Sequence, residues 1–242
     1  MEFYCKTDIG ISRSVNQDAV ASKTLSPCLA WSLICDGMGG TKGGDIASAT
    51  AIEEISIYLD QHLTEASSSE YIKVLMYNAI ENANNKIFEK ASKNLMLRSM
   101  GTTAVLCIVE NDTLHIMYAG DSRVYLLDNE KIKQITKDHS VVQEMVDSGK
   151  ITQEDAKNHP QKNIITRALG VRKNIELDYM KIKIKTNEII LLCTDGLTNE
   201  VSESEIHDIC IKNNISEIPE KLIRKANKAG GHDNITVAVA QV

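Results

Sequence analysis

Apolar residues recur along this chain with two different periods, which separate helical regions from β regions. A helical spacing over about 44–63 and another over about 70–93 each predict a helix with one apolar face. The first face comprises Ile46, Ala49, Ile52, Ile55 and Leu59. The second comprises Ile72, Leu75, Met76, Ala79, Ile80, Ala83 and Ile87. Three serines at 67–69 interrupt the pattern and are expected to cap the second helix.

Short β-branched and aliphatic runs predict strands. They cover 1–7, 29–35, 102–110, 113–119, 123–127, 131–136, 177–184, 188–193 and 234–242, and a further strand begins at Ala19. Short polar turns such as Asn111-Asp112 favour antiparallel pairing. Helical patterns return over 139–160, 203–212 and 218–228. We therefore expect an α+β fold, and about nine to eleven strands favour two stacked antiparallel sheets, a β-sandwich, over one sheet.

Composition narrows the functional classes. The chain has 242 residues, of which 43% are hydrophobic and 25% charged, enough for an ordinary core. The net charge of −6 and the lack of a basic cluster argue against nucleic-acid binding. The six cysteines form no CxxC pair, which favours a reducing compartment. No signal-peptide pattern or long apolar run occurs, so we expect a cytoplasmic protein without membrane insertion, and a single domain over 1–242.

Aspartates stand beside several predicted strands. Asp36 follows one buried run and is followed by Gly37, Asp195 follows another, and Asp18 and Asp233 precede strands. Each alone fits a turn, because aspartate is common in turns. If the strand ends share one edge of a sandwich, the carboxylates converge, repel one another and need cations. These four carry −4, which balances two divalent ions, and Mg²⁺ or Mn²⁺ prefers such oxygen ligands.

Six motifs occur in the order found in one protein family. They are TDIGISRSVNQDAV, CDGMGG, SMGTTAV, YAGDSRVYLL, CTDGL and GGHDNITV. Each motif is weak alone, but their order over about residues 5–240 is specific. The chain resembles the metal-dependent serine/threonine protein phosphatases of the PPM, or phosphatase-2C-like, family, in a compact bacterial form. The resemblance implies two antiparallel sheets packed face to face with helices on both outer faces, in four α-β-β-α layers.

The resemblance also implies roles for individual residues. Asp36 bridges two Mn²⁺ or Mg²⁺ ions, the Gly37 carbonyl binds one of them, and Asp195 and Asp233 hold the first. Asp18 belongs to the same centre directly or through a water. Asp121 with Asp195 resembles an additional third-metal site. Arg13 resembles the arginine that binds the substrate phosphate, a task for which a guanidinium is well shaped.

Two features bear on the chemistry and the choice of substrate. Some family members carry a histidine directly after the Asp-Gly pair, whereas this chain has Met38. The general acid is therefore unassigned: a metal-bound water is one candidate, and His139 is another, although we expect His139 to be a surface residue. Residues 140–166 resemble a mobile flap, which we expect to set substrate preference rather than chemistry. The predicted short helix there has Val141, Val142, Met145 and Val146 on one face.

Four functions are compatible with this sequence. The leading one is hydrolysis of phosphoserine and phosphothreonine in proteins. Such an enzyme would reverse the action of a bacterial serine/threonine kinase on its targets, and we expect it to be a monomer. The alternatives are a catalytically silent phosphoprotein-binding relative, a phosphatase of the sporulation and stress-response branch, and a metal-stabilised binding domain. The carboxylates argue against the silent relative, and the Arg13 motif argues against the sporulation branch.

Overall fold

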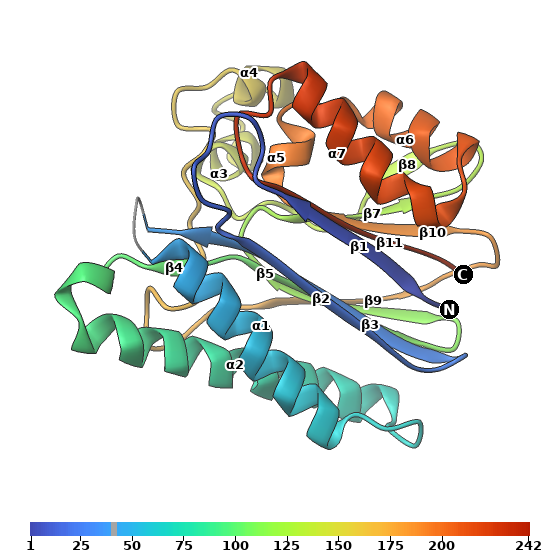
Figure 1. The fold of residues 1–242 in the computed structure, drawn as a ribbon, viewed down its shortest axis with the longest axis horizontal. Coiled ribbons are helices and arrows are strands. Elements are labelled where there is room, and N and C mark those ends of the chain that lie inside the picture. The colour runs from blue at the N-terminus through green and yellow to red at the C-terminus, as the bar shows by residue number, and fades with distance from the viewer. Residues whose placement is uncertain (40–42) are drawn as a thin grey trace.

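Two antiparallel sheets pack face to face, with helices against both outer surfaces (Figure 1). The computed structural model describes residues 1–39 and 43–242. Gly40, the last residue of the CDGMGG motif, lies outside the described residues. The α+β sandwich expected from the sequence is confirmed.

Each sheet combines strands that are distant in sequence. The first sheet has the order β1 (Phe3–Asp8), β11 (Ile235–Gln241), β10 (Ile189–Cys193), β7 (Arg123–Leu127), β8 (Ile132–Gln134). The second has the order β2 (Asp18–Ser26), β3 (Leu29–Met38), β5 (Ala104–Glu110), β6 (Thr113–Ala119), β9 (Asp178–Lys183), and β4 (Gly101–Thr102) pairs with the end of β3. The predicted strand over 102–110 is therefore interrupted at Thr103. There the Asp36 N–H donates to the side-chain Oγ1 of Thr103 (2.9 Å) instead of its backbone carbonyl, although the Thr103 N–H still donates to the Asp36 carbonyl (2.8 Å).

Three apolar layers hold the fold together. The cluster between the sheets includes Ile34, Val105, Ile116, Leu192 and Ala238. A second layer packs α1 (Gly44–His62) and α2 (Ser69–Lys93) on the second sheet, and a third packs α6 (Glu203–Lys212) and α7 (Ile218–Ala229) on the first. The remaining helical segments are α3 (Val141–Asp147), α4 (Gln153–Lys157), α5 (Asp195–Thr198) and the 3₁₀ turns η1 (Leu95–Leu97) and η2 (Ile215–Glu217). No helix in the described ranges is long and apolar enough to cross a membrane.

The two long helices differ in how well their buried faces follow the predicted pattern. In α2 every predicted apolar position is buried, and the Ser68 side chain caps the helix by accepting from the Tyr71 N–H. In α1 the prediction was partly wrong, because Ile46 and Ala49 are exposed. The helix instead buries small residues, and its first residue, Gly44, lies against the backbone of β3: a Cβ there would be 2.7 Å from the Gly37 carbonyl oxygen. Close backbone packing thus turns the larger Ile46 toward solvent.

Candidate active site

Asp18 and Asp36 face each other across two adjacent strands. The antiparallel register of β2 and β3 places them as direct partners, so their side chains leave the same face of the sheet. Asp36 is fixed through its backbone, since its N–H donates to Thr103 Oγ1 (2.9 Å) and its carbonyl accepts from Thr102 Oγ1 (2.9 Å). Asp18 is fixed through its side chain, because Oδ2 accepts from Thr194 Oγ1 (2.9 Å) and Thr236 Oγ1 (2.7 Å).

Three further aspartates come from the other sheet and its connections. Asp195 is the first residue of α5, directly after β10, and its Oδ2 accepts from Asn199 Nδ2 (3.0 Å). Asp233 lies just before β11, and Asp121 lies in the turn between β6 and β7. Gly196 brings the Asp195 and Asp233 segments together, since a Cβ on it would be 2.0 Å from the Asn234 carbonyl oxygen.

These segments border one cleft of about 660 Å³. Its lining includes Asp36, Gly37, Asp121, Asp195, Asp233, Arg13, Met38, Thr103 and, from the predicted flap, Asn163, Ile164 and Ile165. Asp18 lies behind this surface and is buried. Arg13 is the single cationic side chain among the described residues that line the cleft. A cleft with this lining suits a ligand that carries both cations and an anionic group.

The carboxylates strongly affect one another. Burial raises the pKa of Asp18 to about 7, with further increases from Asp195 and Asp233, although the two threonine hydroxyls lower it. Burial and then Asp195 raise the pKa of Asp121 to about 8. The pKa of Asp36 lies well above its usual range because of burial, followed by repulsion from Asp18 and Asp195. Burial and Asp233 also raise the pKa of Asp195. The site therefore holds more negative charge than it can stabilise by itself.

Two observations show that a hard divalent cation suits this donor set. Asp18 Oδ1 is buried without a hydrogen-bond partner among the described residues, an unusual state for a carboxylate oxygen. The lining donors are oxygens, which Mg²⁺ and Mn²⁺ prefer. As the side chains stand, however, no group of three His, Cys, Asp or Glu residues in 1–39 and 43–242 is arranged to hold a metal. Part of the donor set is engaged elsewhere, since Asp233 pairs with Arg13 and Asp195 with Asn199.

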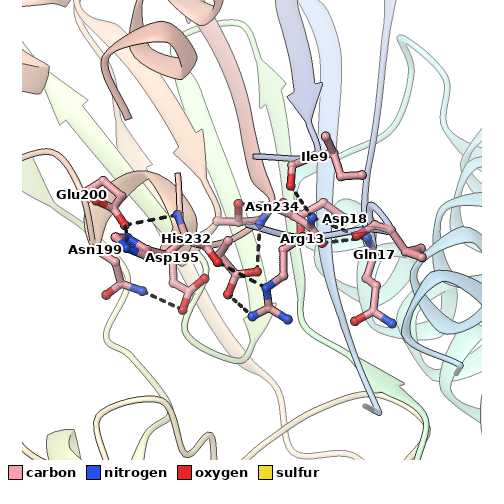
Figure 2. Close-up of polar contacts among 12 residues, drawn as sticks. Ile9, Arg13, Gln17, Asp18, Asp195, Asn199, Glu200, His232 and Asn234 are labelled. Carbon is pink, nitrogen blue, oxygen red and sulfur yellow. Dashed lines mark hydrogen bonds and ion pairs between the residues drawn. The ribbon is translucent and has the colours of Figure 1, made fainter. Parts of the chain in front are cut away.

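Arg13 reaches over the cleft from the loop between β1 and β2. Its Nη2 donates to Asp233 Oδ2 (2.7 Å) and its Nε donates to the His232 carbonyl (3.3 Å), as Figure 2 shows for this group of contacts. The side chain is 49% exposed, so part of the guanidinium faces solvent. Arg13 therefore combines an ion pair to one predicted metal ligand with an open edge that can receive an anion.

His139 is not the surface residue that we expected. It is 8% exposed, and its ring stacks on Tyr118 at a centroid distance of 5.0 Å. Nδ1 accepts from the Gly120 N–H (3.2 Å), while Nε2 lies 3.3 Å from Asp178 Oδ2. Burial lowers its pKa. Its ring nitrogens thus face the Gly120 turn and Asp178, and His139 is absent from the lining of the cleft.

Several polar residues around the aspartates escaped sequence reasoning. Thr194 and Thr236 bind Asp18, Asn199 binds Asp195, and Glu200 Oε1 accepts from His232 Nδ1 (2.6 Å). Figure 2 shows Asn199 and Glu200 directed toward the Asp195 and His232 segments. The sequence could have indicated Thr194, because it stands next to the predicted ligand Asp195 inside the CTDGL motif. No sequence pattern indicated Asn199 or Glu200, because only the short helix α5 brings them back toward the site.

Comparison with known proteins identifies the family. The sequence matches the family described as Protein phosphatase 2C over residues 11–230. The chain belongs to the protein phosphatase 2C family. The resemblance inferred from the six motifs is thereby confirmed, and the chain is a protein phosphatase of this family.

Individual members of the phosphatase family are similar to this chain over nearly all of its length. A serine/threonine phosphatase stp from Listeria welshimeri is 40% identical over 240 residues, covering 98% of this chain and 94% of that protein. The crystal structure of the serine/threonine phosphatase Stp1 from Staphylococcus aureus has a TM-score of 0.93 at 32% identity, covering 100% of this chain and 94% of that one. The catalytic domain of the phosphatase PstP in complex with two manganese ions has a TM-score of 0.85 at 30% identity, covering 99% and 97%.

Proposed function

We propose that this phosphatase hydrolyses phosphoserine and phosphothreonine in proteins at a centre of two Mn²⁺ or Mg²⁺ ions. The observation that supports this most directly is the convergence of Asp18, Asp36, Asp121, Asp195 and Asp233, with raised pKa values in the first four, beside Arg13. The two manganese ions of the PstP structure, a relative at 30% identity, support the two-ion centre.

Each residue has a role that follows from its position. Asp18 on β2 and Asp36 on β3 lie opposite each other. They would hold the ions together with Asp195, Asp233 and the carbonyl of Gly37. Asp121, together with Asp195, would hold a third ion. Bound divalent ions supply a water of lowered pKa as the nucleophile and offset the charge of the phosphate. Thr194 and Thr236 hold the carboxylate of Asp18, and Asn199 holds that of Asp195. Such fixed positions matter because catalysis of phosphoryl transfer depends mainly on positioning and on charge stabilisation.

The protonation of the leaving alkoxide is assigned to no single side chain. Met38 lines the cleft at the position where some relatives carry a histidine, and the described lining contains no histidine at all. His139 faces Gly120 and Asp178 rather than the cleft. We therefore propose that solvent in the site supplies this proton. If His139→Ala abolished turnover of a serine phosphopeptide but spared p-nitrophenyl phosphate, this assignment would be wrong.

The remaining features of the function are inferred by analogy. We propose a single domain over 1–242 that acts as a cytoplasmic monomer on phosphoproteins of a serine/threonine kinase pathway. Residues 140–166 form α3 and α4 and contribute Ile164 and Ile165 to the cleft. We propose that this flap sets substrate preference. Its exchange for the flap of a relative should then change phosphoprotein preference and leave hydrolysis of a small ester nearly intact.

Metal dependence is the test of the proposed function. Release of phosphate from a phosphothreonine peptide should require added Mn²⁺ or Mg²⁺ and should stop in EDTA. Asp195→Asn should lower the rate by about 100-fold or more, because the amide is neutral and binds divalent ions weakly. No turnover by folded, Mn²⁺-loaded wild type would instead favour the alternative, a silent phosphoprotein-binding relative.

Arg13→Ala should lower kcat/KM for a phosphothreonine peptide by about 10- to 100-fold, since a charge-assisted bidentate contact to phosphate is lost. Most of this loss should appear in KM and in weaker inhibition by inorganic phosphate. Arg13→Lys should recover little, because an ammonium group cannot form the bidentate contact. Arg224→Ala, which removes an exposed arginine on α7, is the matched control. It should leave kcat/KM, KM and the inhibition constant for inorganic phosphate unchanged. Equal kinetics for Arg13→Ala and wild type would contradict the assigned role.

A further inference from the structure

The loop that carries Arg13 is attached to the other end of the chain. The N–H groups of Ile11 and Ser12 both donate to the Gly231 carbonyl, at 2.8 and 3.1 Å. Gly10 has φ +80, and a Cβ on it would be only 2.2 Å from the Asp233 carbonyl oxygen. A residue with a side chain would be strained there and would also push the two segments apart. The loop is therefore built to lie against the segment that precedes β11.

Asn234 provides the central attachment. Its Oδ1 accepts from the Gln17 N–H (2.8 Å), and its Nδ2 donates to the Ile9 carbonyl (2.9 Å) and the Val15 carbonyl (3.0 Å). Figure 2 shows this side chain between Ile9 and Gln17, next to Arg13. The residue is 5% exposed. One side chain thus fixes the loop at Ile9, before Arg13, and at Val15 and Gln17, after it.

The side-chain amide of Asn234 has no N–H group left to donate to a substrate. A side-chain amide has two N–H donors, and both are used on backbone carbonyls of the loop. The backbone N–H of Asn234 donates to Asp233 Oδ1 (2.8 Å), while Arg13 holds Asp233 Oδ2. The same short segment therefore fixes the position of both Arg13 and the carboxylate with which Arg13 pairs.

We propose that Asn234 is a positioning residue for the reaction, which holds Arg13 where it receives the substrate phosphate. This inference rests on the proposed function, because it assigns Asn234 an effect through Arg13. A side chain that fixes the backbone on both sides of Arg13 removes much of the conformational freedom that the arginine would otherwise lose on binding phosphate. Loss of Asn234 should accordingly weaken phosphate binding without removing any group that contacts phosphate.

The chain offers a close control for a purely structural role. Asn84 on α2 is also buried, and its amide likewise makes three bonds to backbone of one loop. Its Oδ1 accepts from the Gly170 N–H (2.8 Å), and its Nδ2 donates to the Arg172 (3.1 Å) and Lys173 (2.9 Å) carbonyls. Asn84→Ala should therefore cost a similar amount of stability to Asn234→Ala, but at a loop that does not carry Arg13.

A double-mutant cycle between positions 234 and 13 tests the proposal. With Mn²⁺ and a phosphothreonine peptide, Asn234→Ala should raise KM and lower kcat/KM by about tenfold in the wild-type background. In the Arg13→Ala background the same substitution should change kcat/KM by less than about twofold. Asn84→Ala should have the same small effect in both backgrounds. Hydrogen exchange over residues 9–17 should be faster in Asn234→Ala and unchanged in Asn84→Ala.

Two results would overturn the proposal. One is an equal loss of kcat/KM from Asn234→Ala with and without Arg13, which would show independent action. The other is unchanged hydrogen exchange over 9–17. If Asn234→Ala does not fold, Asn234→Leu takes its place in the cycle, because it keeps the approximate size of the side chain and adds no charge but loses both donors and the acceptor for Gln17. Wild type without Mn²⁺-dependent turnover would contradict the proposed function instead, and hydrogen exchange would still test the attachment of the loop.

Discussion

Replacing Asp36 with asparagine should lower kcat/KM for a phosphothreonine peptide by about 1,000-fold or more and should stabilise the protein in EDTA. Asp36 lines the cleft and lies opposite Asp18, so its loss removes the carboxylate common to the proposed ions. Burial raises the pKa of the same carboxylate, and repulsion from Asp18 and Asp195 raises it further. An asparagine of the same shape relieves that repulsion. Steady-state kinetics with Mn²⁺ and urea unfolding with EDTA measure the two effects.

A surface aspartate is the matched control for this substitution. Asp112 lies in the turn between β5 and β6, where its exposed carboxylate pairs with Lys183. Asp112→Asn should leave kcat/KM within about twofold of wild type and should change stability by less than about 1 kcal/mol, as is typical for exposed ion pairs. Retained Mn²⁺-dependent activity in Asp36→Asn would refute the central role of Asp36. A lower stability of Asp36→Asn in EDTA would refute the repulsion argument.

The stability of the protein in EDTA should fall by roughly 3 kcal/mol between about pH 6.5 and about pH 9. Folding raises the pKa of Asp18 to about 7 and that of Asp121 to about 8. A carboxyl group with a raised pKa takes up its proton more readily in the folded state, so folding is favoured while the group remains protonated. That contribution is lost as the pH rises through the folded pKa. Stability must therefore decrease with pH across this window.

Urea unfolding at several pH values, with EDTA and with Mn²⁺, measures this effect. Bound cations should remove most of the decrease, because they stabilise the ionised carboxylates. Asp18→Asn should make the slope in EDTA smaller, since one of the titrating carboxyl groups is gone. His115 and His139 have lowered pKa values because of burial, so they affect stability mainly at pH values below this window. Stability that rises with pH in EDTA would contradict the raised pKa values of Asp18 and Asp121.

The agreement between sequence and structure is best where local pattern and packing favour the same arrangement. The apolar positions predicted for α2 are all buried, because they recur at helical spacing and the helix buries one face. The face of α1 was predicted less well. Its first turns pack on the backbone near Gly37, where small residues are required, and periodicity of large apolar residues cannot indicate such close approach.

The sequence by itself determined the family, through the order of six motifs, and the sandwich, through the number of strands and the resemblance. It also pointed to the aspartates of the cleft, because each stands at a strand end or turn recognisable from local sequence. Only the tertiary structure decided how these residues are held. The pairing of β2 with β3 places Asp18 opposite Asp36, and residues more than two hundred positions apart meet when Asn234 binds the loop of Arg13. His139 shows the same limit, since its burial against Tyr118 depends on strand β6 and not on its own neighbours. Contacts between distant segments depend on how the sheets pair, and no local pattern encodes them.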